Sequence, residues 1–319
     1  MRLLPAEKTI VIIILTLGII DLALLALKPV RVDVIGYATV MAIAGSLFVA
    51  GQLYRVYRPQ EPGIALATTG AALFTLFTIV GSVFNYMLLP LPFERIDETL
   101  VKIDAMLGYD WPSAVNWIAN YPVSGEILRF VYASSLPQLI LVVLILGFTC
   151  QEQRLHHFLL TGLLGALICI AIWSVFPSSG ASGSNGALKG LTTNFQVMVS
   201  PHYNAEVNRI IAHGAEYVSP SSALGLIGFP SFHTVMACMS VCFMRHYRVL
   251  FVLFGAINLI MIPAVLIHGG HHLVDLIGGL VVFAIAAALA RKAVEQAAVL
   301  RGGVPQAQVQ VQTSVQVSA

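Results

Sequence analysis

Uncharged apolar runs, each about long enough to cross a bilayer as a helix, recur along the chain. The hydrocarbon core of a membrane is about 30 Å thick, which requires about 20 residues of α-helix. The predicted spans are residues 9–27, 34–54, 64–89, 130–149, 158–176, 232–244, 249–267 and 273–289. The sixth looks short, because about 14 residues rise only about 21 Å. This pattern predicts an all-α, polytopic transmembrane helix bundle of about eight spans.

Composition supports the membrane assignment and excludes two other classes of protein. The 319 residues are 58% hydrophobic and 10% charged, whereas ordinary soluble proteins have about 25% charged residues. A soluble globular chain is therefore excluded. The formal net charge is only +2 and no basic run exceeds a pair, so a nucleic-acid-binding protein is excluded as well.

The positions of Lys and Arg predict an orientation, because cytoplasmic ends retain these residues. If the N-terminus is inside, every short inner loop carries arginine. Two long loops, 94–126 and 177–230, then lie outside. The second is rich in Gly, Ser and Asn at its start, which favours an irregular chain able to cover a site.

The first outer loop begins with an amphipathic pattern. Ile96, Leu100 and Ile103 recur at helical spacing, while Asp97 and Asp104 fall on other faces. This spacing predicts a helix that lies on the membrane surface, with its acidic residues turned away from the apolar face.

Two polar motifs stand at the starts of predicted spans. In the first, Pro230 and Ser231 suit a helix beginning and place His233 in its first turn. In the second, His271 and Asp275 are four residues apart, on one helical face. A carboxylate bound to one ring nitrogen leaves the other nitrogen available as a nucleophile or base. Both motifs fall on the outer side, so we expect them to form one pocket for an anion such as phosphate.

Other interpretations of these polar residues are weaker. His272 lies three residues before Asp275, so geometry alone does not exclude it as the paired histidine. A zinc site on His268, His271, His272 and Asp275 is disfavoured, since adjacent histidines on a helix point about 100° apart. A transporter or ion-coupled carrier using intramembrane His and Asp is the alternative function, but no repeat symmetry supports it. We interpret Asp21 and Asn85 as interhelical hydrogen-bonding groups.

At the two motifs the sequence resembles the type 2 phosphatidic acid phosphatase superfamily, in particular its inositol phosphorylceramide synthase-like (inositolphosphotransferase-like) branch. Phe229-Pro230-Ser231-Phe232-His233-Thr234 is similar to the Pro-Ser-x-His motif, and Gly270-His271-His272-Leu273-Val274-Asp275 to the His-x-x-x-Asp motif. The similarity runs from about residue 93 to residue 289, and residues 97–111 resemble the segment before the core in bacterial members.

The resemblance implies a role for each motif residue. His271 would be the nucleophile that forms a phosphohistidine, Asp275 would orient it, and His233 would protonate the leaving alkoxide. Ser231 would help to hold phosphate oxygens. No metal and no other cofactor is implied.

The chain departs from the family pattern at two arginines. Phe176 precedes Pro177 where the family has Arg-Pro, and Ala264-Val265 replaces Ser-Arg. Because the charge on a transferring phosphoryl group must be neutralised, other outer-loop cations are expected to take over. The predicted replacements are Lys189, Arg209 and His268, with His202 and His213 as further possibilities.

The sequence thus predicts an integral membrane enzyme of lipid metabolism. Residues 1–92 would form N-terminal spans, 93–290 a catalytic domain completing a six-helix core, and 291–319 a disordered cytoplasmic tail. The substrate partner would be a membrane lipid phosphate or phosphodiester. Water as acceptor would make the protein a phosphatase (hydrolase), and a small alcohol such as inositol would make it a phosphotransferase. A bacterial-type inner membrane is expected, with the active site on the outer, periplasmic side.

Overall fold

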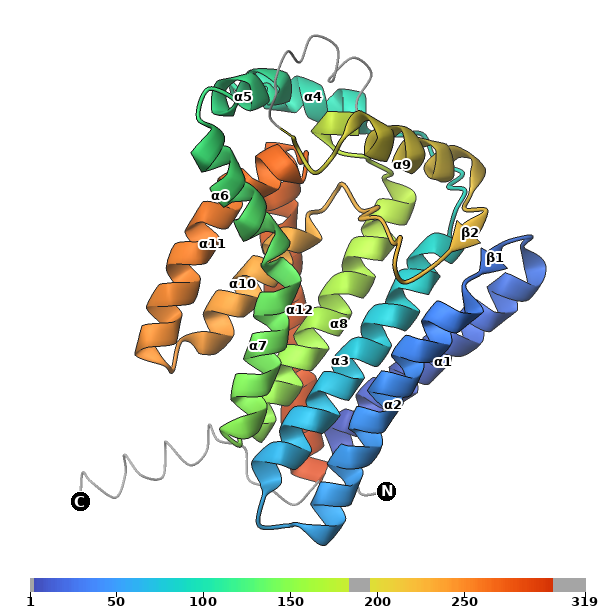
Figure 1. The fold of residues 1–319 in the computed structure, drawn as a ribbon, viewed down its shortest axis with the longest axis vertical. Coiled ribbons are helices and arrows are strands. Elements are labelled where there is room, and N and C mark those ends of the chain that lie inside the picture. The colour runs from blue at the N-terminus through green and yellow to red at the C-terminus, as the bar shows by residue number, and fades with distance from the viewer. Residues whose placement is uncertain (1–2, 184–195, 301–319) are drawn as a thin grey trace.

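A computed structural model describes residues 3–183 and 196–300, and it is a bundle of helices capped at one end (Figure 1). The elements are α1 (Pro5–Leu27), β1 (Arg31–Val32), α2 (Val34–Tyr57), α3 (Pro62–Met87), α4 (Asp97–Met106), α5 (Trp111–Ile118), α6 (Pro122–Ala133), α7 (Ser135–Phe148), α8 (Glu152–Val175), the 3-10 helix η1 (Ala181–Gly183), α9 (Pro201–His213), β2 (Tyr217–Val218), α10 (Phe232–Met244), α11 (Arg248–His268) and α12 (Leu273–Leu300).

The all-α membrane bundle predicted from the sequence is confirmed. Within the described residues, six helices are long and apolar enough to cross a membrane, namely α1, α2, α3, α8, α11 and α12. The sixth predicted span is α10, which has only 13 residues, as its short apolar run indicated. Helix α12 continues to Leu300, beyond the predicted end at residue 289, so residues 291–300 are helical and do not belong to a disordered tail. Residues 301–319 lie outside the described part of the chain.

The fourth predicted span is not one straight helix. Helices α6 and α7 meet at an angle of 47°. Pro137, in the first turn of α7, has no backbone N–H, and its ring would clash with the carbonyl of a continuous helix. The hydroxyl groups of Ser134 and Ser135 donate to the carbonyl oxygens of Val131, at 2.6 Å, and Tyr132, at 2.8 Å. The bend tilts α6 relative to α7.

The N-terminal helices pack along one side of the bundle (Figure 1). Helix α3 contacts α1, α2, α7 and α8, whereas α2 lies at the edge and buries only Ala44, Gly51 and Gln52. The two terminal guanidinium nitrogens of Arg55, Nη1 and Nη2, donate to the carboxylate of buried Glu7, at 2.6 and 2.7 Å. This ion pair joins α1 to α2 at the end opposite the cap.

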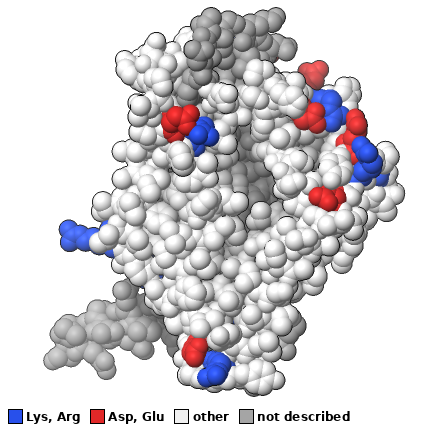
Figure 2. Space-filling model, viewed as in Figure 1, with Lys and Arg blue, Asp and Glu red and all other residues white. Residues whose placement is uncertain are grey.

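Helices α4, α5 and α9 lie across the other end of the bundle as a cap (Figure 1). Two short parallel strands fix part of it, because Arg31 pairs with Tyr217 and Val32 with Val218. The middle of the face shown in Figure 2 carries few charged side chains, which gather toward the two ends. A face with so few charges in its middle suits contact with membrane lipid.

Candidate active site

The first histidine motif forms the N-terminus of α10. Ser231 is buried, and its hydroxyl oxygen accepts a long hydrogen bond of 3.4 Å from the backbone N–H of Thr234. This cap satisfies one of the free donors at the helix start. The backbone N–H of Ser231 donates to the carbonyl oxygen of Asp275 at 2.9 Å. The backbone therefore joins the first motif directly to the second.

The second motif holds a buried histidine–carboxylate pair. His271 Nδ1 lies 3.0 Å from Asp275 Oδ2, and both side chains are at least 95% buried. The same carboxylate oxygen accepts a hydrogen bond from the backbone N–H of His272 at 2.9 Å. With Nδ1 held by the carboxylate, Nε2 of His271 is the nitrogen left for chemistry. The spacing of four residues predicted this pair, but the expected shared helical face is absent, because α12 begins at Leu273 and His271 lies in the loop before it.

The two motifs converge at one place. The ring centroids of His233 and His271 lie 6.0 Å apart, with the rings inclined at 66°. His233 also stacks on Tyr132 of α6, with 4.4 Å between centroids. The convergence predicted from the topology is thus present, and Tyr132 is an additional residue that fixes the position of the His233 ring.

The chain after α8 folds over both motifs. The backbone N–H of Ser182 donates to the carbonyl oxygen of Gly270 at 3.3 Å, and the carbonyl oxygen of Ser178 accepts from Gly228 at 3.2 Å. Gly270 has a φ of +60°, and a Cβ at this residue would clash with the side chain of Ser182. A glycine is required there because the backbone conformation and the close approach both exclude larger residues.

This geometry coincides with a family match. The model of the PAP2 superfamily matches residues 98–289, which is more than half of the chain and includes both histidine motifs. The chain belongs to the PAP2 superfamily. The resemblance seen in the sequence is confirmed at this level, and membership implies a phosphatase-type enzyme. No curated protein and no solved structure matches the chain, and the inositol phosphorylceramide synthase-like branch stays a prediction.

A second histidine–carboxylate pair adjoins the PAP2 motif. His272 Nδ1 lies 2.7 Å from Asp104 Oδ2, and the backbone N–H of Leu273 donates to Asp104 Oδ1 at 3.1 Å. Burial raises the pKa of Asp104, although the hydrogen bond from His272 opposes this effect. Asp104 therefore ties α4 to the first turn of α12.

The prediction that Asp97 and Asp104 lie on other faces of α4 than the apolar residues was wrong. Asp97 and Asp104 are buried together with Leu100. Their spacing of three and four residues places all three on one helical face, and this was the signal available in the sequence. They face inward because partners satisfy their oxygens, so the cost of burying the carboxylates is offset.

Arg95 is a cation that sequence reasoning missed, and it binds the segment that folds over the two motifs. Its Nε donates to Asp97 Oδ2 at 2.7 Å, and its guanidinium also binds the hydroxyl of Ser179. Asp97 Oδ1 in turn accepts hydrogen bonds from Ser178 Oγ at 2.9 Å and from the backbone N–H of Ser179 at 3.0 Å. Arg95 and Asp97 thus hold the segment that follows Pro177, where other PAP2 proteins carry the Arg-Pro motif.

Two of the predicted replacement cations, Arg209 and His268, bind groups other than the two histidine rings. Lys189 lies outside the described residues. Arg209, on α9, binds Glu206 at 2.8 Å and Glu216 at 3.0 Å, so its charge is already paired on the cap surface. His268 lies in the last turn of α11, where its Nε2 is 3.0 Å from the carbonyl oxygen of Gly125.

His202 and His213 both lie on α9, in the cap. No group of three or more His, Cys, Asp or Glu side chains suited to a metal ion occurs among the described residues.

Proposed function

We propose that this protein transfers a phosphoryl or phosphodiester group from a membrane lipid through a phosphohistidine on His271. The observation that carries the proposal is the convergence of two histidines from separate motifs, with ring centroids 6.0 Å apart. One of them is oriented by a buried carboxylate, as a nucleophile requires. The other stands beside it, as a general acid requires.

The proposed reaction has two steps. Nε2 of His271 attacks phosphorus, the bond to the lipid alkoxide breaks, and His233 gives its proton to the leaving oxygen. Asp275 stabilises the positive charge that develops on the His271 ring. In the second step His233 takes a proton from the acceptor hydroxyl, which attacks the phosphohistidine and frees His271. Ser231 accepts a bond from Thr234, so its own proton is available for a phosphate oxygen.

We further propose that the site faces the outer, periplasmic side of the membrane. The motifs lie at the capped end, and Arg55, Arg58 and Arg291 lie toward the other end, where cytoplasmic positive charge is expected. Membership in the inositol phosphorylceramide synthase-like branch would favour an alcohol such as inositol as the acceptor. Transfer to water would use the same three residues, His233, His271 and Asp275.

Labelled substrate tests this function directly. Purified protein would be incubated with phosphatidic acid that carries radioactive phosphate, with and without inositol, and the products identified. We expect free phosphate with water as acceptor and labelled inositol phosphate with inositol as acceptor. His271→Ala should abolish both products, whereas His246→Ala, at an exposed histidine on the α10–α11 turn, should not. Full turnover by His271→Ala would exclude the phosphohistidine mechanism.

A further inference from the structure

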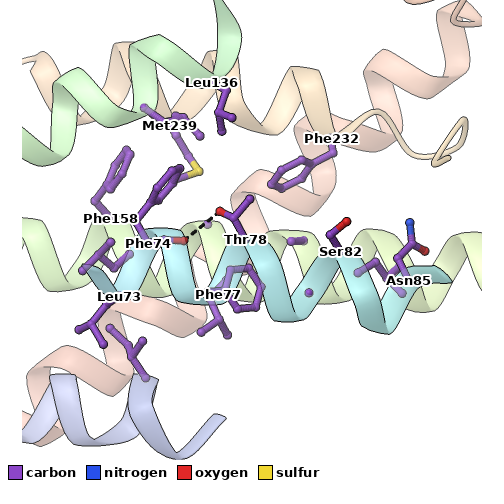
Figure 3. Close-up of a pocket in the computed structure, with 18 of the residues that line it drawn as sticks. Leu73, Phe74, Phe77, Thr78, Ser82, Asn85, Leu136, Phe158, Phe232 and Met239 are labelled. Atoms are coloured by element: carbon purple, nitrogen blue, oxygen red, sulfur yellow. Dashed lines mark hydrogen bonds between the residues drawn. The ribbon is translucent and has the colours of Figure 1, made fainter. Parts of the chain in front are cut away.

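A long apolar cavity lies beside the first histidine motif (Figure 3). It has a volume of about 220 Å³ and is walled mainly by α3, α7, α8 and α10. On α3 its lining follows one face, marked by Leu73, Phe77, Gly81 and Asn85. These positions extend over about 18 Å of helix. The cavity is therefore narrow and elongated along the helix axes.

The cavity adjoins the candidate active site. Phe232 of α10 and Leu136 of α7 lie across it from α3 (Figure 3). Phe232 immediately precedes His233 in the chain. Leu136 follows Tyr132 by four residues, and Tyr132 stacks on the His233 ring. A molecule in the cavity would thus lie next to the elements that position His233.

The cavity opens sideways, on the surface of the bundle that would face membrane lipid. Its two ends differ in polarity. Thr78 is exposed and Leu136 is 43% exposed, so the opening faces the surface where membrane lipid would lie. Near one end, Asn85 is 8% exposed, and its Oδ1 has no hydrogen-bond partner among the described residues. The other end, at Leu73 and Phe158, is apolar.

We expected Asn85 to form an interhelical hydrogen bond, but its Oδ1 has no partner among the described residues and lies at the polar end of the cavity. A buried amide oxygen without a partner is costly, and so is an empty apolar cavity, because its lining loses dispersion contacts. A dry cavity of about 150 Å³ is already large enough to bind benzene. The space along α3 therefore suits a ligand with a long hydrocarbon part and a polar group at one end.

We propose that this cavity binds one hydrocarbon chain of the lipid substrate, with Asn85 facing the polar end of that chain. The proposal rests on the proposed function, which takes the substrate to be a lipid phosphate. Helix α3 and Ile10, which also lines the cavity, lie outside the matched residues 98–289. The N-terminal helices would therefore help this chain to select its lipid.

Filling the cavity tests the proposal. The three atoms nearest to a Cβ on Gly81 all belong to the Phe77 ring, at 3.4 Å or more, so Gly81→Leu would extend into the cavity without a backbone clash. Gly18→Leu is the matched control, since nothing lies within 4 Å of a Cβ at Gly18. The kcat/KM values of both variants would be measured with dioleoyl and dihexanoyl phosphatidic acid in the same detergent.

We expect Gly81→Leu to lower kcat/KM for the dioleoyl lipid by about tenfold or more relative to the dihexanoyl lipid, because long chains lose buried methylene contacts. Gly18→Leu should keep the wild-type ratio. An unchanged ratio in a folded Gly81→Leu variant would overturn the cavity proposal and leave the proposed function intact. If the proposed function itself were wrong, His271→Ala would instead retain full turnover.

Cross-linking of the unmodified protein provides a test that does not depend on folding of a variant. A phosphatidic acid with a diazirine at the end of one chain would be photoactivated in the presence of protein, and the labelled peptides identified. We expect labels on α3 and α8 near Leu73 and Phe158. Labels confined to the outward-facing side chains of α2 and α11 would overturn the proposal.

Discussion

At the scale of single residues, the proposed reactivity of His271 depends on which ring nitrogen is held. A neutral imidazole can attack phosphorus only from its unprotonated nitrogen. Asp275 binds Nδ1 at 3.0 Å and also accepts from the backbone of His272, so the carboxylate is fixed before it orients the ring. The side chain of Asp275 is fully buried, which keeps water from competing for this hydrogen bond.

Asp275→Asn is therefore expected to lower kcat by about 10²- to 10⁴-fold, the range typical of groups that orient or assist a catalytic histidine. The amide keeps the size of the side chain but no longer stabilises the charged ring. Turnover of labelled phosphatidic acid would measure the effect. Asp110→Asn is a suitable control, because Asp110 only caps α5 through the backbone of Ser113. Near-normal turnover by Asp275→Asn would contradict the assigned role.

The spacing of His271 and Asp275 made their pairing predictable, because the interaction is local in the chain. Asp104 and His272 are also in contact, but 168 residues separate them, and no local pattern specifies such a partner. The arginine near the site was missed for the same reason, since Arg95 meets Ser179 only after α8 has crossed the bundle. Sequence patterns thus predicted the pair within one motif and not the contacts from α4.

At the scale of elements, α4 acts as a clamp on the second motif. Asp104 binds the side chain of His272 and the backbone of Leu273, which precede and begin α12. Asp97, on the same face, binds the segment after α8. A helix expected to lie on the membrane surface thus fixes two loops that bound the site.

Asp104→Asn should loosen this clamp. We expect kcat/KM to fall about tenfold and amide hydrogen exchange to rise in α4 and at the start of α12, with exchange in α1–α3 unchanged. Burial raises the pKa of Asp104, so in the wild type the clamp loses its charge when pH falls through that raised value. The acid limb of the pH–activity profile should therefore change in the variant.

Glu98→Gln serves as the control for this experiment, because Glu98 lies on the exposed face of α4. It should leave rate, exchange and pH profile unaltered. The clamp would be ruled out if both variants behaved alike.

The bend between α6 and α7, unlike the contacts of α4, had a local signal in the sequence. Pro137 marks it, and a span prediction that took this proline into account would have found the bend.

At the scale of the whole molecule, the proposed orientation rests on the charge distribution and the position of the cap. The cap and both histidine motifs lie at one end, and the α2–α3 turn lies at the other (Figure 1). Apolar runs predicted eight spans, and all eight regions are helical, but only six helices among the described residues are long and apolar enough to cross a membrane. These runs could not predict how the helices pack, because packing depends on side-chain shape.

Cysteine labelling would test the orientation. In a variant that lacks Cys150, Cys169, Cys238 and Cys242, Asn120→Cys and Gln60→Cys would each be exposed to a membrane-impermeant maleimide on intact spheroplasts. Both native side chains are exposed, one in the cap and the other in the α2–α3 turn. We expect Asn120→Cys to react at once and Gln60→Cys only after permeabilisation. The reverse result would place the site in the cytoplasm.

The parallel pairing of β1 with β2 has a consequence for biosynthesis. Arg31 and Val32 leave the ribosome long before their partners Tyr217 and Val218, because chains are made from the N-terminus. Helices α1 and α2 must therefore enter the bilayer while β1, which lies between them, is still unpaired. A nascent chain that ends soon after Val218 would contain both strands, β1 and β2, but neither His233 nor His271.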